Sequence, residues 1–471
     1  MTIVPGKIAD NFSSFLSERS SIIGKQEFAD YLISFKFSIE ATELLNNPNY
    51  LLKNYPKVFY FENPNEKISF IAFGSAMEIS ENGLGRFSSL SKTYKEIKGK
   101  TICNWDQKTE PMPLVCGGMK FTPEHSEDEW IDFKDSEWFV PEFLIMKNQN
   151  SFSVLYNFLN QSSSPKKLIE KFTQRVETFN NFQFNKENNS VKILSTKGLS
   201  PKDKKKWKIL VSDALDKMNE LSISKIVASR RVDLVLSEEL NWTEIRDYFN
   251  VHYPDCYFFF FRNNNSIFFG ATPERLIRIH DKKIIIDAMA GSIVRGKTEE
   301  EDKKLESEML SSSKLNHEHD LVVHQFKRAI AKYVTKIFTH KVPFKKLHNI
   351  QHLHTSLQSE LLEDTNLFEV LEAIYPTAAV CGEPRDKALS LLKKLELHKR
   401  GLYSGIIGYF NFFNDGEFFI GIRSALFHEN KLYVYAGSGL VEGSDPEDEF
   451  EETEVKLNAI LNFFDGQNKN K

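Results

Sequence analysis

Acidic residues that could bind a metal ion are concentrated in the second half of the 471-residue chain. Glu318 lies in the run His317-Glu318-His319, and Glu449 and Glu452 belong to an acidic run near the C-terminus. Glu449 and Glu452 are three residues apart, so on a helix they share one face. Hard cations such as Mg²⁺ prefer carboxylate oxygens. A solvated first turn that complements the helix dipole is the simpler interpretation of the terminal run.

Two other residues have neighbours suited to proton transfer. Lys225 is followed at once by Ile-Val-Ala, and a lysine drawn into an apolar sheet can act as a base because burial disfavours its charged form. Glu274 follows Pro273 after the apolar run SIFFGA. Partial burial there would raise the pKa of the carboxyl and make it a proton donor. An exposed lysine and an ordinary surface acid are the simpler alternatives.

Two patterns that suggest familiar ligand sites lack the spacing that those sites need. On a helix His317 and His319 point about 200° apart, so they cannot chelate one zinc ion, and HExxH is absent. The run GSGLVEG, residues 437–443, is one residue too long for the dinucleotide motif GxGxxG, and no GxxxxGK[ST] phosphate loop occurs. The sequence therefore favours neither zinc nor nucleotide binding.

Composition excludes several classes of partner. Lysine and arginine total 61 against 65 acids, a net charge of −4, so no basic field is available for nucleic acid or anionic lipid. The first twenty residues lack the features of a secretory signal, and no apolar stretch reaches membrane-spanning length, so we expect a cytoplasmic protein. The four cysteines lie far apart and are expected to be free thiols.

Helical patterns surround the acidic and basic residues. A helix begins after the N-cap Ser200, with Pro201 in its first turn and Asp203 at its third position. A long helix is expected from about residue 299 to about 338 with a break near 311, and the last helix from 444 to about 464. Shorter helices are expected at 367–375 and 386–398.

Strand patterns fill most of the remainder. They cover residues 224–236, 282–294, 404–413, 417–427 and 431–441, with a hairpin over 255–280 that turns at 263–265. The first 150 residues mix short aromatic strand-like runs with turns, and contain no catalytic motif. Runs of antiparallel strands interrupted by helices predict an α+β fold with layered sheets.

Motif after motif from about Lys206 to Phe464 resembles the chorismate-binding enzyme family, which includes anthranilate synthase component I. In order the motifs are SKIVASR, FFGATPERL, AMAGSIVRG, SSSKLNHEHDLVV, HNIQHLHTSL, YPTAAVCGEP, RGLYSGIIGYF, GIRSALF and YAGSGLVEGSDPEDEFEETEVK. A weaker resemblance continues upstream in SFIAFGSAMEI and PLVCGGMKF. The family resemblance implies one α+β domain over residues 1–471, with two stacked, mainly antiparallel sheets flanked by helices. Residues 1–200 would form the N-terminal sheet-forming part and 201–465 the part with the catalytic motifs.

The resemblance also implies a reaction. Family members that add water to chorismate have a lysine where Lys225 stands, whereas members that add ammonia have glutamine. Members with a covalent lysine have it where this chain has Ala290. The resemblance therefore implies conversion of chorismate to isochorismate. Lys225 would deprotonate the water that attacks ring carbon C2, and Glu274 would protonate the hydroxyl leaving C4.

The remaining site residues are implied in the same way. Glu318 and Glu452, with Glu449 nearby, would hold Mg²⁺ at the ring carboxylate, and Arg423 would pair with the enolpyruvyl carboxylate. Gly291 would allow the main chain to approach the substrate closely. The other residues expected at the substrate are Ser292, His352, Thr377, Tyr403, Gly437 and Ser438. A structural histidine is an equal alternative for His352.

Several alternatives remain open at this stage. A salicylate synthase would form isochorismate in the same pocket and then eliminate pyruvate, and an ammonia-using synthase would form anthranilate. A non-catalytic scaffold would have no reason to keep Lys225, Glu274, Glu318 and Glu452 together. The product is expected to enter menaquinone biosynthesis, with siderophore biosynthesis as the alternative. The resemblance favours a monomer.

Overall fold

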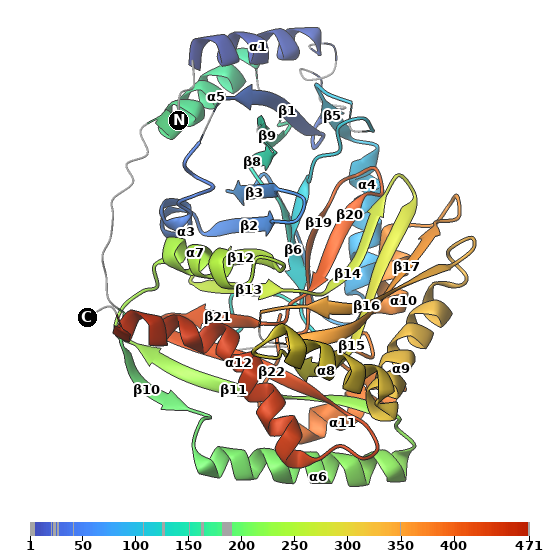
Figure 1. Ribbon diagram of the computed structural model, residues 1–471. Helices are drawn as coiled ribbons and strands as arrows, with labels where there is room; N and C mark the ends of the chain where they lie inside the picture. The colour runs from blue at the N-terminus through green and yellow to red at the C-terminus, as the bar shows by residue number, and fades with distance from the viewer. Residues whose placement is uncertain are drawn as a thin grey trace.

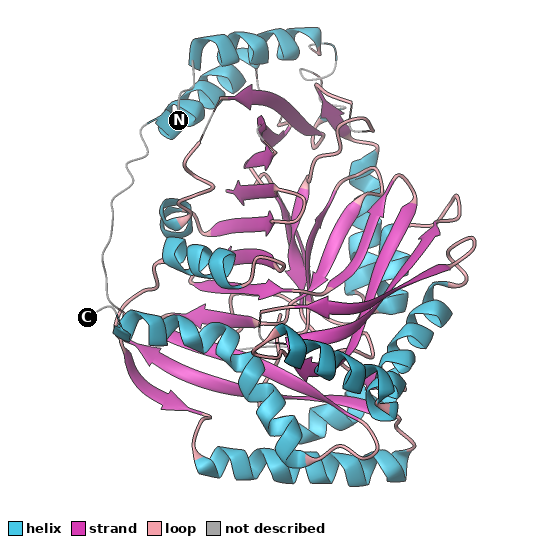
Figure 2. Cartoon of the chain, viewed as in Figure 1, coloured by secondary structure: helices cyan, strands magenta, loops and turns pink. Residues whose placement is uncertain are grey.

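Two large β-sheets form the centre of the molecule, and most helices lie outside them (Figures 1 and 2). The computed structural model describes residues 5–469 apart from 20, 22–24, 26–27, 41, 107, 125–127, 150, 162–163, 181–190 and 349.

The first sheet has 13 strands among the described residues. In spatial order they are β10 (Ile193–Lys197), β11 (Lys225–Leu236), β22 (Lys431–Leu440), β21 (Ser424–His428), β13 (Ser266–Thr272), β12 (Tyr257–Asn263), β2 (Lys57–Asn63), β3 (Ile68–Phe73), β8 (Phe143–Asn148), β9 (Ser151–Leu159), β1 (Leu32–Ile39) and β5 (Thr101–Cys103), with β18 (Gly382–Glu383) also beside β11.

The second sheet has nine strands within the same described ranges. They are, in order, β16 (Phe338–Lys346), β17 (Ile350–Glu360), β15 (Lys283–Val294), β14 (Arg275–His280), β20 (Gly416–Ile420), β19 (Ile406–Phe410), β6 (Val115–Met119), β7 (Ser136–Val140) and β4 (Met77–Glu81). The helices are α1 (Pro5–Glu18), α3 (Asn49–Asn54), α4 (Arg86–Lys98), α5 (Pro165–Asn180), α6 (Pro201–Leu221), α7 (Trp242–His252), α8 (Glu299–Ser311), α9 (Ser313–Ile330), α10 (Leu367–Ile374), α11 (Arg385–Leu395) and α12 (Pro446–Lys469).

Aromatic side chains pack the two sheets against each other. The ring of Phe419 in the second sheet lies 5.0 Å from Phe61 and 4.4 Å from Tyr257 in the first, centroid to centroid. Every strand pair is antiparallel except β1 with β5, as far as the described residues show. The predicted α+β class with two stacked, mainly antiparallel sheets is therefore confirmed.

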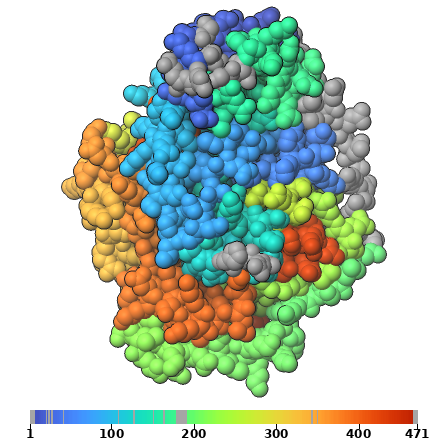
Figure 3. All heavy atoms as spheres, turned by 180° about the vertical axis from the view of Figure 1, so that it is seen from behind, coloured from blue at the N-terminus to red at the C-terminus, as the bar shows by residue number. Residues whose placement is uncertain are grey.

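Both sheets take strands from both halves of the chain. In the first sheet β12 pairs with β2, and in the second β19 pairs with β6. Seen from behind, segments of the first 150 residues lie against segments near the C-terminus (Figure 3). This sharing supports the single-domain interpretation, which stays a prediction. None of the helices within the described residues combines the length and apolar character needed to cross a membrane.

Several local predictions are confirmed. The Ser200 side chain accepts a hydrogen bond from the Asp203 backbone, and Asp203 reciprocates, so α6 begins with a complete capping box. The hairpin of β12 and β13 turns at Asn264, whose φ is +51°. The long helix is broken at Ser312, whose side chain caps α9.

Three predicted boundaries are wrong. The second arm of the hairpin predicted over 255–280 ends at Thr272, because the chain then crosses to the second sheet and residues 275–280 pair there as β14. The long helix ends at Ile330 rather than near Phe338, because Thr335 bonds the carbonyl of Glu360 and the chain then forms the edge strand β16. Pro343 lies in this strand, where an edge position tolerates the missing N–H. The segment 417–427 is not one strand. Its chain leaves the second sheet after Ile420 and enters the first at Ser424, with Arg423 at a φ of +50° between them.

Candidate active site

A cavity lies where the ends of both sheets meet α9 and α12. Of the predicted site residues, those that line it are Glu274, Ser292, Glu318, His352, Tyr403, Arg423, Gly437 and Glu452. The others, Lys225, Gly291, Thr377, Ser438 and Glu449, lie outside the lining set. The structure therefore brings most of the predicted residues to one place, although they come from distant parts of the chain.

Lys225 lies beside the cavity and pairs with Glu318, which lines it. It is the first residue of β11, 1% exposed, and its Nζ is 2.9 Å from Oε1 of Glu318 on α9. The neighbouring strand comes very close here, since a Cβ added at Gly439 would lie 2.5 Å from the same oxygen. The ion pair thus joins β11 to α9 at the cavity floor.

Glu274 is a buried carboxyl in the connection between β13 and β14. Its backbone N–H donates to Thr272 Oγ1 over 3.2 Å, and its carbonyl accepts from Ile420 over 3.0 Å. The residue is 4% exposed, and its carboxyl has no hydrogen-bond or ion-pair partner among the described residues. Burial raises the pKa of Glu274 to about 8, against the opposing influence of Lys225. The Glu274 carboxyl therefore keeps its proton at neutral pH, as a proton donor would have to.

Arg423 presents an unpaired charge to the cavity. The positive φ that separates β20 from β21 places this residue at the crossing between the two sheets, 6% exposed. Across the described part of the chain, its guanidinium has no hydrogen-bond or ion-pair partner, and burial lowers its pKa. A buried, unpaired guanidinium is costly unless an anion binds there.

His352 is a neutral donor or acceptor at the cavity wall. Its Nδ1 lies 2.8 Å from Ser292 Oγ on the adjacent strand, and its Nε2 is buried without a partner among the described residues. Burial, with Arg423 and Lys456 adding to the effect, holds the pKa of His352 well below its usual value. One ring nitrogen is therefore structurally engaged and the other available.

The three carboxylates expected to bind a metal lie in the first two turns of α9 and α12, and all three act electrostatically on Lys314. Glu449 is 3% exposed and pairs with Lys314 of α9 over 2.9 Å, while its other oxygen accepts from Ser438. Glu452 pairs with Lys456, whose Nζ also donates to the Gly437 carbonyl over 2.9 Å. Burial and the neighbouring Glu452 both raise the pKa of Glu449.

Each of these carboxylates is neutralised by a lysine. Within the described residues no group of three or more His, Cys, Asp or Glu side chains is placed to hold a metal ion as it stands. The donor set is nevertheless made of carboxylate oxygens alone, which suits a hard divalent cation. His319 is not part of it, because its Nε2 faces Thr355 Oγ1 of β17 at 2.8 Å.

The backbone conformation and close packing at Gly291 require a residue without a side chain. It has a φ of +73° and forms the irregularity between β15 and β17, and a Cβ there would lie 2.9 Å from the Leu315 carbonyl of α9. Its neighbours Ala290 and Ser292 line the cavity. Thr377 has a buried Oγ1 without a partner among the described residues.

Among the cavity residues to which sequence reasoning assigned no role, Lys456 and Tyr435 have polar or aromatic side chains suited to contact a substrate. Lys456 lines the cavity and contacts Glu452, a pairing that the i,i+4 spacing on α12 could have indicated. Tyr435 lines it with its ring stacked on Tyr403, 5.1 Å between centroids and 15° between planes. No local pattern pointed to that pair, because the two tyrosines lie on separate segments.

Comparisons with known proteins agree with this geometry. The model of a family described as chorismate binding enzyme matches residues 17–465. The chain is 26% identical to isochorismate synthase MenF of Bacillus subtilis over 448 residues, 93% of this chain and 94% of that protein. It is 28% identical to a salicylate biosynthesis isochorismate synthase of Pseudomonas aeruginosa over 403 residues, 85% and 83% of the two chains. The structure of MenF, the menaquinone-specific isochorismate synthase of Escherichia coli, shares the fold with a TM-score of 0.76 at 20% identity, over 96% of this chain and 99% of that one.

Proposed function

Since the chain belongs to the chorismate-binding enzyme family, we propose that it is an isochorismate synthase, which converts chorismate to isochorismate. The observation that carries the proposal is one cavity with a buried unpaired guanidinium, a buried protonated carboxyl and a buried lysine beside it. Chorismate carries two carboxylates and a hydroxyl that must leave, and these three groups match its needs.

Arg423 binds the enolpyruvyl carboxylate. Its planar guanidinium can donate two parallel hydrogen bonds to a carboxylate, which would satisfy the charge that the cavity otherwise leaves unpaired. Ser292, His352, Tyr403 and Gly437 line the same space and orient the ring. The neutral His352 offers Nε2 to the substrate without adding charge.

Proton transfer is divided between Lys225 and Glu274. The Lys225 amine takes a proton from the water that attacks C2, the ring double bonds shift, and the C4–O bond breaks. Glu274 gives its proton to the departing hydroxyl, which leaves as water. One water enters and one leaves, so the net reaction is an isomerisation. The raised pKa of Glu274 keeps the acid protonated at neutral pH.

Glu318, Glu452 and Glu449 would hold a Mg²⁺ ion. The support for this proposal is the ligand type, since carboxylate oxygens suit a hard divalent cation, which would neutralise the ring carboxylate. As they stand, the three side chains pair with lysines, so they would have to turn toward the ion. Lys314 and Lys456 balance Glu449 and Glu452, and Lys225 pairs with Glu318 until it gives up its proton to serve as the base. The carboxylates are thus available at the cavity without leaving a large net negative charge near an anionic substrate.

Incubation of the purified protein with chorismate and Mg²⁺, followed by chromatography and NMR, tests the proposal. We expect isochorismate and neither salicylate nor pyruvate. Accumulation of salicylate with pyruvate would identify a salicylate synthase, and ammonium-dependent anthranilate an ammonia-using enzyme. Either result, or unreacted chorismate, would contradict the proposal.

For the pathway we propose menaquinone biosynthesis, at a cytoplasmic location. The relative that matches 93% of the chain is a MenF, and the E. coli MenF is described as menaquinone-specific. Deletion of the gene should lower cellular menaquinone, and added isochorismate-derived intermediates should restore it. Loss of a catecholate siderophore with unchanged menaquinone would contradict this assignment.

A further inference from the structure

An arginine that is not in the cavity joins three segments of its wall. Arg400, in the connection between α11 and β19, is 4% exposed. Its guanidinium donates to the Val380 carbonyl over 2.8 Å and to the Val227 carbonyl of β11 over 2.6 Å. Both valines line the cavity. Arg400 therefore connects two segments of the cavity wall that are about 150 residues apart in the sequence.

A third strip follows directly along the chain. The backbone N–H of Tyr403 donates to the Arg400 carbonyl over 2.9 Å, and its ring lies 6.0 Å from the guanidinium carbon. Tyr403 lines the cavity, and its hydroxyl comes within 3.0 Å of a Cβ added at Gly437. Tyr403 and Arg423 line the same cavity and act on each other electrostatically. In the proposed function this end of the cavity binds the enolpyruvyl group.

Glu396 holds Arg400 in this orientation. Its carboxylate accepts from Arg400 Nε over 2.9 Å and from a terminal guanidinium nitrogen over 2.6 Å. The same carboxylate accepts from the Ser229 backbone over 2.7 Å and from Ser229 Oγ over 2.8 Å. Although burial alone would raise it, the nearby guanidinium keeps the pKa of Glu396 below its usual value. The Arg400 guanidinium therefore makes four hydrogen bonds with its five N–H groups and cannot turn without breaking several of them.

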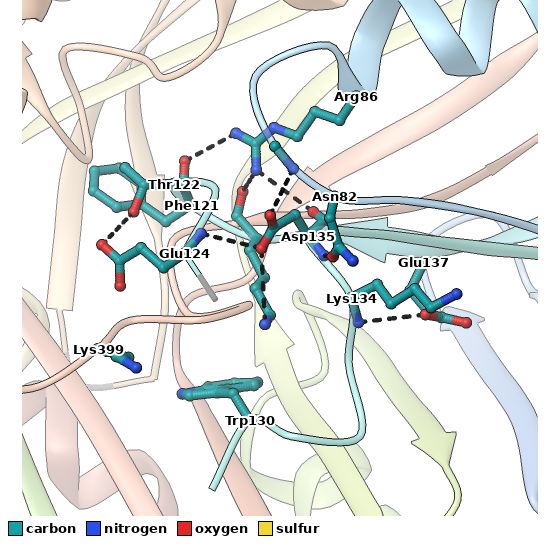
Figure 4. Close-up of polar contacts among 12 residues, drawn as sticks. Asn82, Arg86, Phe121, Thr122, Glu124, Trp130, Lys134, Asp135, Glu137 and Lys399 are labelled. Atoms are coloured by element: carbon teal, nitrogen blue, oxygen red, sulfur yellow. Dashed lines mark hydrogen bonds and ion pairs between the residues drawn. The ribbon is translucent and has the colours of Figure 1, made fainter. Parts of the chain in front are cut away.

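Residues of the N-terminal half pack against the Arg400 guanidinium and the residue that follows it. The Phe121 ring lies 4.4 Å from the Arg400 guanidinium carbon, and its backbone N–H donates to the Gly401 carbonyl over 2.7 Å. Phe121 is itself held by the buried Arg86, which donates to its carbonyl over 3.2 Å (Figure 4). Trp130 packs on Gly401 so closely that a Cβ there would lie 2.1 Å from the indole.

We propose that Arg400 is a positioning residue for the reaction and that, locked by Glu396 and Ser229, it sets the shape of the wall against which the enolpyruvyl end of chorismate packs. This inference rests on the proposed function. The bonds of Arg400 end on residues of the cavity wall and not on the proposed acid or base. We therefore expect the Arg400–Glu396 pair to affect substrate affinity, in addition to any effect on folding.

Glu396→Gln is the direct test, with Glu137→Gln as the matched control. The Glu137 side chain is also buried and pairs with a lysine, Lys57, over 2.8 Å. Neither Lys57 nor Lys134, whose backbone also donates to Glu137, lines the cavity. We expect both variants to lose stability, whereas only Glu396→Gln raises KM for chorismate, by about 10-fold, the usual effect of one charged hydrogen bond. Its kcat should stay within about 2-fold of wild type, since the acid and base are untouched.

Ser229→Ala keeps the test open if Glu396→Gln fails to fold. It removes the hydroxyl bond to Glu396 and the contact of the same hydroxyl with His398 Nε2 at 3.0 Å, and it keeps the backbone bond from Ser229 to Glu396. We expect a KM about 3-fold higher with a normal kcat. Equal KM values for Ser229→Ala or Glu396→Gln and for Glu137→Gln would overturn the inference while leaving the proposed function intact. A wild-type protein that leaves chorismate unchanged would overturn both. A fall in kcat with unchanged KM would also contradict the positioning role.

Discussion

Replacing Glu274 with glutamine should abolish the reaction and stabilise the protein at high pH. The carboxyl is buried without a partner among the described residues, and its pKa of about 8 compares with 4.5 for the free group. Between these values the folded protein keeps a proton that the unfolded chain has lost. Wild-type stability therefore decreases as the pH rises from 4.5, and the decrease is complete once the pH passes the folded pKa of about 8.

The size of the effect follows from the pKa. From pH 6 to the folded pKa of about 8, each pH unit costs the wild type about 1.4 kcal/mol, so the total is about 3 kcal/mol. Glutamine carries no titrating proton and does not pay this cost. The stability advantage of Glu274→Gln over wild type should thus grow by about 3 kcal/mol between pH 6 and pH 9.

Urea unfolding of both proteins at pH 6 and pH 9 measures this difference, and kcat measured alongside should fall by about 100-fold or more in the variant. Wild-type kcat should itself decrease above pH 8 as the acid loses its proton. Glu137→Gln, which breaks a buried ion pair, should instead destabilise the protein at both pH values. A stability difference that does not change with pH, or a variant with normal kcat, would refute the reasoning.

Three further perturbations bear on the same site. Lys225→Ala should lower kcat by about 100-fold or more with little change in KM, measured by initial rates, because it removes the base and not a binding group. Arg423→Met should raise KM by about 100-fold while the melting temperature stays level or increases, since an unpaired buried guanidinium is lost; a lower melting temperature with normal KM would show a structural role instead. Chelation with EDTA should stop turnover and added Mg²⁺ restore it, and Glu318→Gln should raise the Mg²⁺ concentration needed; full activity in EDTA would exclude the cation.

Local patterns predicted much of the fold because the interactions behind them are local. The capping box of Ser200 and Asp203, the hairpin turn at Asn264 and the helix break at Ser312 each depend on residues within a few positions. The wrong boundaries arose where tertiary pairing decides. Strand β16 forms because β17 offers it an edge, and the split at Arg423 occurs because its two flanking segments join different sheets.

The site was predictable in part for the same reason. The three-residue spacing of Glu449 and Glu452 placed them on one helical face. No local pattern indicated that Glu318, about 130 residues earlier, would lie near them. That expectation came from the family resemblance alone. The contact of Lys314 with Glu449 was missed because it joins two helices that are distant in the sequence. The pairs Lys456–Glu452 and Arg400–Glu396 are four residues apart, so their spacing could have indicated them, but it could not show that they lie at or beside the cavity.

The origin of the new hydroxyl tests the central claim most directly. If Lys225 activates a solvent water at C2 while Glu274 expels the C4 hydroxyl, turnover in ¹⁸O-labelled water must place one heavy oxygen in each isochorismate molecule formed, detectable by mass spectrometry. Product that retains only the light oxygens of chorismate would mean that the hydroxyl migrates within the substrate, and the assignment of base and acid would be wrong.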